Sequence, residues 1–340
     1  MKRLRVAVLM GGRSSEHDVS MASARSVLDA LADRYDTVSV EIERSGRWSL
    51  PAAAPSRELP ARDERPVETL PVPAEAAVPV TLASVDVIFP VLHGPFGEDG
   101  TVQGLLELAD IPYVGPGVLS SALCMDKDVF KAVLRDGGIP VTPSVTLREG
   151  DPLSHPFDYP VFVKPARLGS SVGISKVHDA SELEAAVALA RSHGEKVLIE
   201  EFISGLEVEC SVLGNLDPVA SLPGQIAIGA EWYDYSAKYD EGGMELIVPP
   251  PLPSETIERV RELAVSAFTL GECEGMARVD FFVRENGEVL VNELNTIPGF
   301  TATSVFSRLF EASGISYPEL LDRLIELALE RHARKNRYIF

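Results

Sequence analysis

The sequence predicts an α/β protein in which an N-terminal domain with a parallel β-sheet is followed by two α+β lobes. The chain has 340 residues, which is enough for two or three domains. Strand and helix patterns alternate through its first third, as they do in parallel sheets covered by helices. Short apolar runs with few helices between them fill the remainder. We expect the N-terminal domain to span residues 1–125 and the two lobes to span residues 126–203 and 204–340.

Composition and charge exclude several classes of protein. Apolar residues make up 45% of the chain and charged residues 24%, which is ordinary for a globular protein and argues against disorder. No stretch reaches the roughly 18 apolar residues of a membrane span, and a net charge of −20 opposes nucleic-acid binding. The three cysteines are widely spaced, which fits a reducing compartment. We therefore expect a cytoplasmic protein with no membrane or nucleic-acid partner.

The first third of the chain contains the elements of the parallel sheet. The apolar run Val6–Met10 predicts a first strand that ends at a pair of glycines, and a helix follows over about 18–33. Two further strands and a helix are expected at Thr37–Ile42, Val85–Leu92 and Thr101–Ala109. Residues 51–80 hold seven of the 25 prolines, so we expect an irregular surface segment there.

The two lobes are predicted to consist mainly of short strands. A helix over Asp126–Arg135 opens this region and stops at a glycine pair. Five strands and one helix are expected next, at Val141–Leu147, Tyr159–Lys164, Ile174–Val177, Lys196–Phe202 and Leu206–Leu213, with the helix at Ser181–Arg191. The last third combines a helix over Ser254–Leu270, a hairpin within 276–295 and a final amphipathic helix around 320–328.

The most informative segment is the predicted hairpin. The Asn-Gly pair at 286–287 lies between two apolar runs, which is a strong signal for a two-residue turn. Such a turn places Asp280 directly opposite Glu293, whereas a three-residue bulged turn would shift this register. Because side chains alternate across a strand, four polar residues share one face: Arg278, Asp280, Glu293 and Asn295. The residues expected on the other face are Val279, Val283, Leu290 and Leu294.

Two like charges directly opposite each other destabilise a sheet, so this carboxylate pair requires an explanation. A divalent cation supplies one, because Mg²⁺ is held by a few protein oxygens together with substrate phosphates and water. We therefore expect Asp280, Glu293 and Asn295 to be metal ligands. The alternative is a solvent-exposed face on which charges cost little. The polar stretch Thr296–Thr303, directly after the hairpin, argues against that alternative.

Two segments of the central region have features of a nucleotide site. Lys164 ends an apolar strand and precedes a Gly/Ser-rich loop to Gly173, whose backbone N–H groups could wrap phosphate oxygens. This loop is not a P-loop, because the Gly-Lys-Ser/Thr order is absent. The apolar strand from Val197 runs into Glu200 and Glu201, which could bind adenine and ribose. Taken alone, each segment also fits an ordinary hairpin loop or a strand end with solvated acids.

Two loops of the N-terminal domain are predicted to face one crevice. Residues 11–17 and 93–100 each follow a strand, and ligands of open α/β sheets bind at the carboxyl ends of strands. The three-glycine spacing of a dinucleotide fingerprint is absent, so NAD is not expected. A histidine such as His93 is often a structural residue, but its glycine-rich acidic loop makes it a site candidate.

The motifs of the chain, taken in order, resemble those of the D-alanine–D-alanine ligase family. They are Gly11-Gly-Arg-Ser-Ser-Glu-His-Asp-Val-Ser20, His93-Gly-Pro-Phe-Gly-Glu-Asp-Gly100, Met125-Asp-Lys127, Lys164-Pro-Ala-Arg-Leu-Gly-Ser-Ser-Val-Gly173, Tyr233-Asp-Tyr-Ser-Ala-Lys-Tyr239 and Asn292-Glu-Leu-Asn-Thr-Ile-Pro-Gly-Phe-Thr301. The resemblance runs from about residue 5 to about residue 330. It implies an ATP-grasp fold, a homodimer, and an enzyme that joins two D-alanines for peptidoglycan synthesis, using ATP and two Mg²⁺, with Mn²⁺ as a possible substitute.

The same resemblance implies roles for individual residues. The ATP phosphates would contact Lys127, Lys164 and Lys238, and the adenine and ribose would contact Glu200, Glu201, Phe202, Ile203 and Glu207. The metal ligands would again be Asp280, Glu293 and Asn295. Glu16 would bind the ammonium of the first D-alanine and form a hydrogen-bonded triad with Ser170 and Tyr239. The remaining catalytic and substrate contacts would come from His93, Arg278, Gly299, Ser304 and Val305, where the family commonly has Leu at the last position.

The implied reaction passes through an acyl phosphate that water must not reach, so we expect a lid at Glu231–Gly243. The alternatives are a D-alanine–D-lactate ligase, another ATP-grasp ligase, and a homologue that senses ATP without catalysis. No metal or phosphate group is missing from the motifs, which argues against the sensor. A structural protein without a ligand would not need the opposed Asp280 and Glu293.

Overall fold

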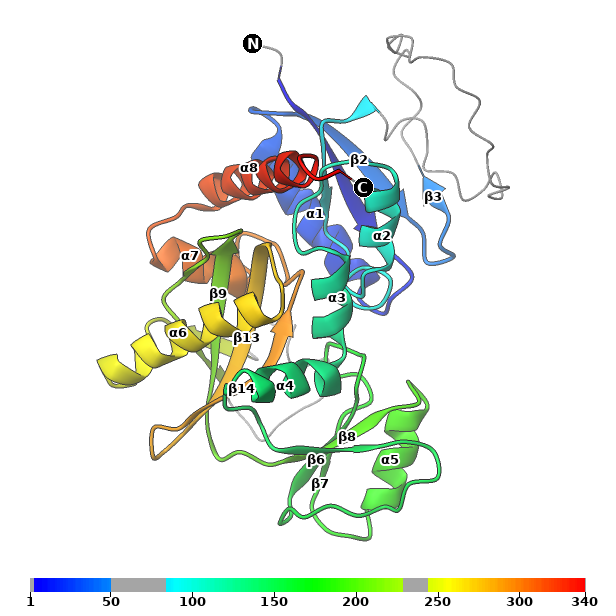
Figure 1. Cartoon of the computed structure of the whole chain (residues 1–340), viewed down its shortest axis with the longest axis vertical. Helices are drawn as coiled ribbons and strands as arrows, with labels where there is room; N and C mark the ends of the chain where they lie inside the picture. The colour runs from blue at the N-terminus through cyan, green and yellow to red at the C-terminus, as the bar shows by residue number, and fades with distance from the viewer. Residues whose placement is uncertain (1–2, 50–83, 229–243, 340) are drawn as a thin grey trace.

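The structure, a computed structural model, describes residues 3–49, 84–228 and 244–339. This part of the chain contains three β-sheets with helices packed against them (Figure 1). The proline-rich segment 51–80 and the predicted lid Glu231–Gly243, with Lys238 and Tyr239, lie outside the described residues. Among the described residues, no helix is both long enough and apolar enough to cross a membrane.

The N-terminal sheet has the strand order β3-β2-β1-β4. Strand β1 (Arg5–Gly11) lies parallel to both β2 (Asp36–Ile42) and β4 (Val87–Pro90), and β3 (Trp48–Ser49) pairs with β2 in the antiparallel direction. The predicted parallel sheet is therefore confirmed. Alternate residues of β1 belong to different apolar clusters, one containing α1 (His17–Leu31) and the other α2 (Thr101–Leu108). Both faces of the strand are thus covered, which explains its continuous apolar run.

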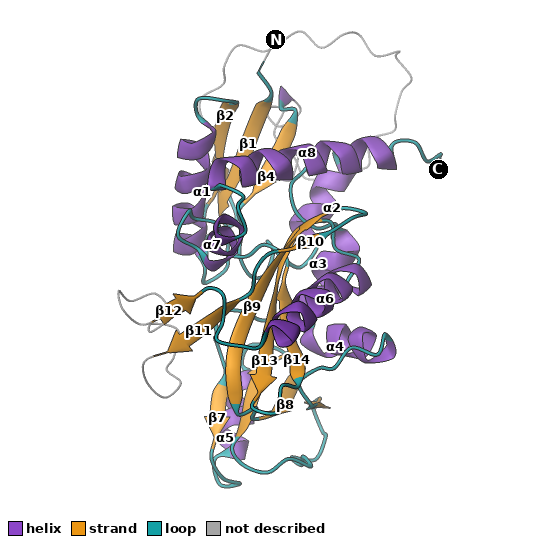
Figure 2. Ribbon diagram, turned by 90° about the vertical axis from the view of Figure 1, so that its left-hand side faces the viewer, coloured by secondary structure: helices purple, strands orange, loops and turns teal. Residues whose placement is uncertain are grey.

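The last two helices of the chain return to this N-terminal domain. Helices α7 (Val305–Ala312) and α8 (Tyr317–Lys335) contribute apolar side chains to the cluster that holds β1, β4 and α1. Figure 2 shows α8 lying across the sheet. The C-terminal helices are therefore part of the core of the N-terminal domain.

The central lobe contains an antiparallel sheet with the order β5-β8-β6-β7. Its elements are β5 (Ser144–Leu147), β6 (Val161–Pro165), β7 (Ser175–Val177), α5 (Leu183–Arg191) and β8 (Val197–Glu201). Apolar residues of the strands pack against α5 on one face. The loop between β6 and β7 contains the Gly/Ser-rich segment, so the flap predicted after Lys164 connects two neighbouring strands.

The C-terminal lobe is built on the sheet β12-β11-β9-β13-β14, with β10 (Val219–Ala220) paired to β9. The other strands are β9 (Gly205–Gly214), β11 (Gly224–Ile228), β12 (Met244–Ile247), β13 (Gly275–Arg284) and β14 (Val289–Asn295). Helix α6 (Ser254–Leu270) covers one face together with residues of α3 (Val118–Met125) and α4 (Lys127–Asp136). Helix α4 thus packs on this sheet, although it precedes the strands of the central sheet in sequence. The domain boundaries at 126 and 204 remain predictions.

The hairpin β13–β14 differs from the prediction in its turn. Arg284 and Glu288 close a three-residue loop at 285–287, with hydrogen bonds from Arg284 N to Glu288 O and from Gly287 N to Arg284 O, both 2.9 Å. Gly287 adopts φ +85°, which glycine tolerates best. The two-residue turn at 286–287 was therefore a wrong prediction.

A β-bulge restores the predicted register nearer the predicted metal site. Asp280 pairs with Glu293, but the next pair is Phe281 with Val291, so Asn292 is an extra residue on β14. Asp280 therefore lies opposite Glu293, and Arg278 opposite Asn295, as predicted. Leu290 pairs with Phe282 and lies on the polar side, so its predicted place on the other face was wrong. The residues found in the apolar core as predicted are Val279, Val283 and Leu294.

Candidate active site

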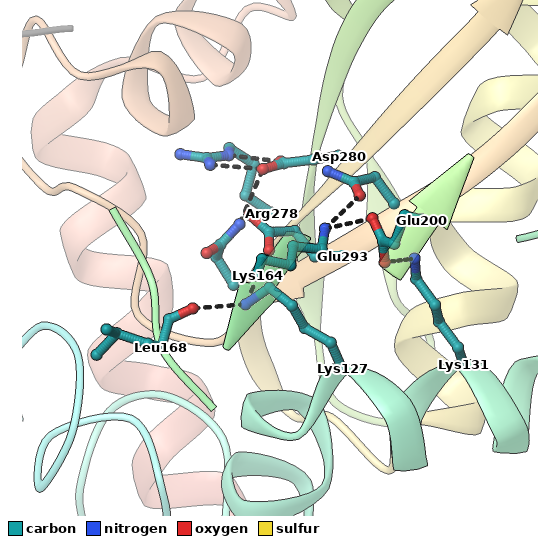
Figure 3. A network of polar contacts seen from close by, with 10 residues as sticks. Lys127, Lys131, Lys164, Leu168, Glu200, Arg278, Asp280 and Glu293 are labelled. Atoms are coloured by element: carbon teal, nitrogen blue, oxygen red, sulfur yellow. Dashed lines mark hydrogen bonds and ion pairs between the residues drawn. The ribbon is translucent and has the colours of Figure 1, made fainter. Parts of the chain in front are cut away.

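Three carboxylates lie in a row across the face of the C-terminal sheet opposite α6. Asp280 on β13 pairs with Glu209 on β9 and with Glu293 on β14. Like charges so close together destabilise a sheet unless cations balance them. The cations that pair with these carboxylates come from two elements (Figure 3): Arg278 on β13 and Lys127 on α4.

Arg278 is held by two of these carboxylates. Its Nε and Nη2 donate to the two oxygens of Asp280 at 2.7 Å each, and Nε lies 2.9 Å from Oε2 of Glu209. Asn295 Nδ2 donates to Asp280 at 2.9 Å. Burial would lower the pKa of Arg278, but Asp280 and Glu209 outweigh it and hold that pKa well above its usual value. The guanidinium is therefore a fixed positive charge beside the predicted metal ligands.

The predicted ligands fit a hard cation by their chemistry. Asp280, Glu293 and Asn295 offer carboxylate and amide oxygens, which suit Mg²⁺ better than a soft metal. Among the described residues, no group of three or more His, Cys, Asp or Glu side chains is arranged to hold a metal alone. A cation here would therefore depend on Asn295 and on oxygens from the substrate or water, as Mg²⁺ commonly does.

Lys127 links the central lobe to the C-terminal sheet. Helix α4 begins at this residue because Asp126 caps it, accepting the N–H of Val129 at 3.2 Å. The ammonium of Lys127 lies 3.0 Å from Glu293 and donates to the carbonyl of Leu168 at 2.8 Å. Burial opposes the charge, but Glu293 outweighs it and raises the pKa of Lys127.

Lys164 lies beside a fully enclosed carboxylate. Its ammonium is 2.6 Å from Oε2 of Glu200 and 3.3 Å from Oδ1 of Asn292. The other oxygen of Glu200 accepts a hydrogen bond from Lys131, one helical turn beyond Lys127 (Figure 3). Burial would raise the pKa of Glu200, but Lys131 and Lys164 lower it. Both oxygens of Glu200 are thus paired with lysines. The backbone N–H and C=O groups of the next residues are therefore better candidates for hydrogen bonds to adenine.

The structure brings Glu16 and Ser170 together from different parts of the chain. Ser170, in the β6–β7 loop, donates its hydroxyl to the carboxylate of Glu16 at the start of α1. Ser170 has φ +53°, a left-handed conformation that is uncommon for a residue other than glycine. A Cβ at Gly94 would lie 2.5 Å from Oε2 of Glu16, and Gly94 has φ +73°, so a larger residue there would displace the carboxylate and strain the backbone. Glu16 makes no side-chain cap to α1, so the carboxylate is directed elsewhere.

His93 and Glu98 connect the N-terminal loop to the segment after β14. The Nδ1 atom of His93 lies 2.8 Å from the carbonyl of Ile297, and burial lowers the pKa of the ring. Glu98 accepts N–H groups from Gly94 at 2.7 Å and from Ile297 at 2.9 Å. Burial and the charge of Glu16 raise the pKa of Glu98 to about 8. His93 thus already has a hydrogen-bond partner within the protein, and its contact with substrate remains a prediction.

The remaining predicted residues border this region. Ser304 hydrogen-bonds Thr301 Oγ1 at 2.8 Å, and a Cβ at Gly299 would lie 3.4 Å from its Oγ. Val305 packs against the small apolar cluster under β11 and β12.

The residues predicted to bind adenine and ribose lie on β8, on β9 and between these strands. Glu201 pairs with Arg284 at 2.7 Å, and the ammonium of Lys176 lies 4.7 Å from the ring of Phe202. Ile203 is buried, and Glu207 lies on β9 opposite Phe282.

Three residues were missed by sequence reasoning. Glu209 joins the carboxylate row only through the pairing of β9 with β13, which no local signal reveals. Lys131 was detectable as a lysine four residues after Lys127, on the same helix face and among apolar neighbours. Glu98 lies within the motif at 93–100, and no role for it was predicted.

The β6–β7 loop and the carboxylate-bearing sheet, joined by Lys127 through Leu168 and Glu293, have the arrangement of an ATP-grasp enzyme. Two family models match the chain: D-ala D-ala ligase N-terminus over residues 5–116 and D-ala D-ala ligase C-terminus over residues 133–326. The chain therefore belongs to the D-alanine–D-alanine ligase family, whose members are ATP-dependent ligases.

Individual relatives agree with this assignment. The chain is 48% identical to the D-alanine–D-alanine ligase of Solibacter usitatus, over 98% of each chain. The D-alanine–D-alanine ligase from Coxiella burnetii superposes with a TM-score of 0.82 at 36% identity, covering 99% of this chain and 97% of that one. A Bacillus anthracis D-alanine–D-alanine ligase complexed with ATP has a TM-score of 0.77 at 29% identity, covering 98% and 99%. These matches confirm the predicted fold.

Proposed function

We propose that this chain joins two D-alanine molecules into D-alanyl-D-alanine, with conversion of ATP to ADP and phosphate, for peptidoglycan synthesis. The observation that carries the proposal is the carboxylate row on the C-terminal sheet, in which Asp280 and Glu293 are balanced by Arg278 and Lys127. With a divalent cation on its carboxylates, a site of this kind would neutralise phosphate charge, and the reaction would require no protein nucleophile. Such a site therefore suits phosphoryl transfer between two substrates.

The chemistry begins with the carboxylate of the first D-alanine. A carboxylate is a poor acyl donor, because its leaving group would be oxide. Attack of a carboxylate oxygen on the γ-phosphorus breaks the bond to ADP and forms an acyl phosphate. The amine of the second D-alanine then attacks the acyl carbon, and phosphate leaves from the tetrahedral intermediate. Both steps require positioning and charge neutralisation rather than covalent help from the protein.

Each group of residues has a proposed part in these steps. Lys127 and Lys164 would bind the ATP phosphates, and Arg278 would stabilise the charge that develops on the reacting carboxyl group. Glu16, oriented by Ser170, would hold the ammonium of the first D-alanine. The backbone at 201–203 and the Glu207 side chain would bind the adenine and ribose. The residues proposed to engage the substrate carboxylates are His93, Gly299, Ser304 and Val305, with Lys238, Tyr239 and the lid 231–243 proposed to close over the site.

Asp280, Glu293 and Asn295 would hold Mg²⁺, or Mn²⁺ in its place. When bound, such a cation neutralises the phosphate oxygens and aligns them for transfer. The support for this assignment is the donor set: Asp280 lies opposite Glu293, and Asn295 on the same face adds an amide oxygen, which together suit Mg²⁺. We further propose that the chain acts in the cytoplasm as a homodimer, as the family resemblance implies.

The test is phosphate release from ATP with and without D-alanine, with the product identified by mass. We expect release that depends on D-alanine and a product with the mass of the dipeptide. Offering D-lactate together with D-alanine would distinguish the alternative, because an ester-forming ligase yields a depsipeptide instead. A rate of phosphate release that does not change when D-alanine is added would contradict the proposal.

A further inference from the structure

Lys131 is a fully buried lysine for which the mechanism above has no use. It lies on α4 between Phe130 and Leu134, which belong to the apolar core. Its side chain is 0% exposed, and its ammonium contacts Glu200 and lies 3.4 Å from the carbonyl of Thr142. Burying an ammonium costs several kcal/mol before any partner compensates it. An apolar residue would fill this position at a lower cost, so the charge requires an explanation.

The explanation lies in how Glu200 is shared. One carboxylate oxygen accepts from Lys131, and the other lies 2.6 Å from Lys164. The three groups come from α4, β8 and β6, and all are at least nine-tenths buried. Burial lowers the pKa of Lys131 to about 8, so below that pH two ammonium groups and one carboxylate leave a net charge of +1. Lys164 is the member that contacts Asn292, the residue before Glu293 on β14, so the surplus charge lies toward the proposed metal ligands.

We propose that Lys131 is a positioning residue for ATP, which acts by holding one oxygen of Glu200 so that Glu200 does not neutralise Lys164. The inference rests on the proposed function, because it takes Lys164 to be a phosphate ligand. Lys131 itself touches no substrate. Its charge reaches the phosphate only through Glu200, and this indirect route gives the proposal a specific signature.

The signature is that Lys131 affects ATP binding only while Glu200 carries its charge. Lys131→Met leaves one ammonium and one carboxylate, so the cluster becomes neutral and Glu200 can turn both oxygens to Lys164. We expect the Kd for ATP to rise about tenfold, or ~1.4 kcal/mol. Adding Glu200→Gln to Lys131→Met restores the net charge of +1. The double variant should therefore bind ATP more tightly than the single variant, although it removes two buried polar partners instead of one.

The experiment is a calorimetric titration of the full chain with MgATP in the absence of D-alanine, together with the Tm of each variant. Recovery of ATP affinity in the double variant supports the proposal. A purely structural Lys131 predicts a lower Tm with unchanged ATP affinity in the single variant, and no recovery in the double. Either of those results would overturn it. Arg331→Met is the matched control, since Arg331 is another buried cation but contacts Tyr113 and Gly115.

If Lys131→Met alone does not fold, the role of Lys131 can still be tested by making the same change in the Glu200→Gln variant. Starting from Glu200→Gln, the further change Lys131→Met should alter the Kd for ATP by less than about threefold, because the intermediary is already absent. A tenfold loss in that background would mean that Lys131 acts directly, and would contradict the proposal. D-alanine-dependent phosphate release by the wild type is measured separately. Its absence would refute the proposed function while the ATP titrations still decide the role of Lys131.

Discussion

The hydroxyl of Ser170 donates a hydrogen bond to the carboxylate of Glu16, although the two residues are 154 positions apart. Ser170 belongs to the flap of the central lobe, and Glu16 begins the first helix of the N-terminal domain. The contact therefore joins the proposed phosphate site to the proposed site for the first D-alanine. A substrate ammonium bound to Glu16 would lie next to the flap.

Glu16→Gln should raise the KM for the first D-alanine and leave stability almost unchanged. A charge-assisted hydrogen bond contributes about 1.5–3 kcal/mol, which corresponds to roughly a 10- to 150-fold change in affinity. The Tm should hold, because the Glu16 side chain does not cap α1. Initial rates at varied D-alanine and thermal unfolding test this. Asp18→Asn is the control on the same helix turn, and a fall in Tm with unchanged kinetics would assign Glu16 to structure instead.

Glu293→Gln should abolish most turnover at limiting Mg²⁺. Stabilisation of phosphoryl charge by a bound cation is worth several kcal/mol, so we expect a loss of more than about a hundredfold. The fold should survive, because relief of repulsion with Asp280 offsets the weaker contact with Lys127. Rates across a Mg²⁺ titration give the measurement, with the exposed Glu288→Gln on the same hairpin as control. Near-normal turnover at low Mg²⁺ would show that Glu293 is not a ligand.

Glu98→Gln should make the protein relatively more stable as the pH rises from 5 to 9. The pKa of Glu98 is raised from 4.5 to about 8, mainly by burial, so the folded state binds more protons than the unfolded state between these values. Wild-type stability therefore falls over this range, by on the order of 4 kcal/mol from this one group. The neutral glutamine removes the effect. The difference in Tm between variant and wild type should grow with pH, and a constant difference would contradict the assignment.

Gly287→Ala should lower stability by about 1 kcal/mol without changing activity. Gly287 has φ +85°, and a Cβ there would meet no atom within 4 Å, so backbone strain is the whole cost. Denaturant unfolding and phosphate release measure the two quantities. Lost activity in a folded variant would show that the hairpin turn influences the site.

Much of this architecture was predictable because local patterns and tertiary contacts agree. The apolar run Val6–Met10 gave the buried strand β1, and the amphipathic pattern around 320–328 gave α8. Helix α7 and strands β11 and β12 went unpredicted because they are short, although α7 does carry apolar residues at helical spacing. The docking of α8 on the N-terminal sheet is a long-range contact that no local pattern encodes.

In the candidate site too, contacts that follow from local sequence were predictable and contacts between distant segments were not. The pairing of Asp280 with Glu293 followed from strand alternation and hairpin register. Glu209 and Lys131 could not be placed beside them, because their positions depend on the pairing of β9 with β13 and on the packing of α4. The predicted register was right although the predicted turn was wrong, since the three-residue loop and the bulge at Asn292 compensate each other.

Because the loop and the bulge compensate each other, β14 contains one residue, Asn292, that pairs with no residue of β13. Because Asn292 has no partner across the ladder, β14 can absorb or release one position between the turn and the carboxylates. A change of one residue in the loop at 285–287 can then be accommodated by loss or relocation of the bulge, while Asp280 still pairs with Glu293. The outer end of the hairpin is thereby free to vary in length without moving the charged groups at its inner end.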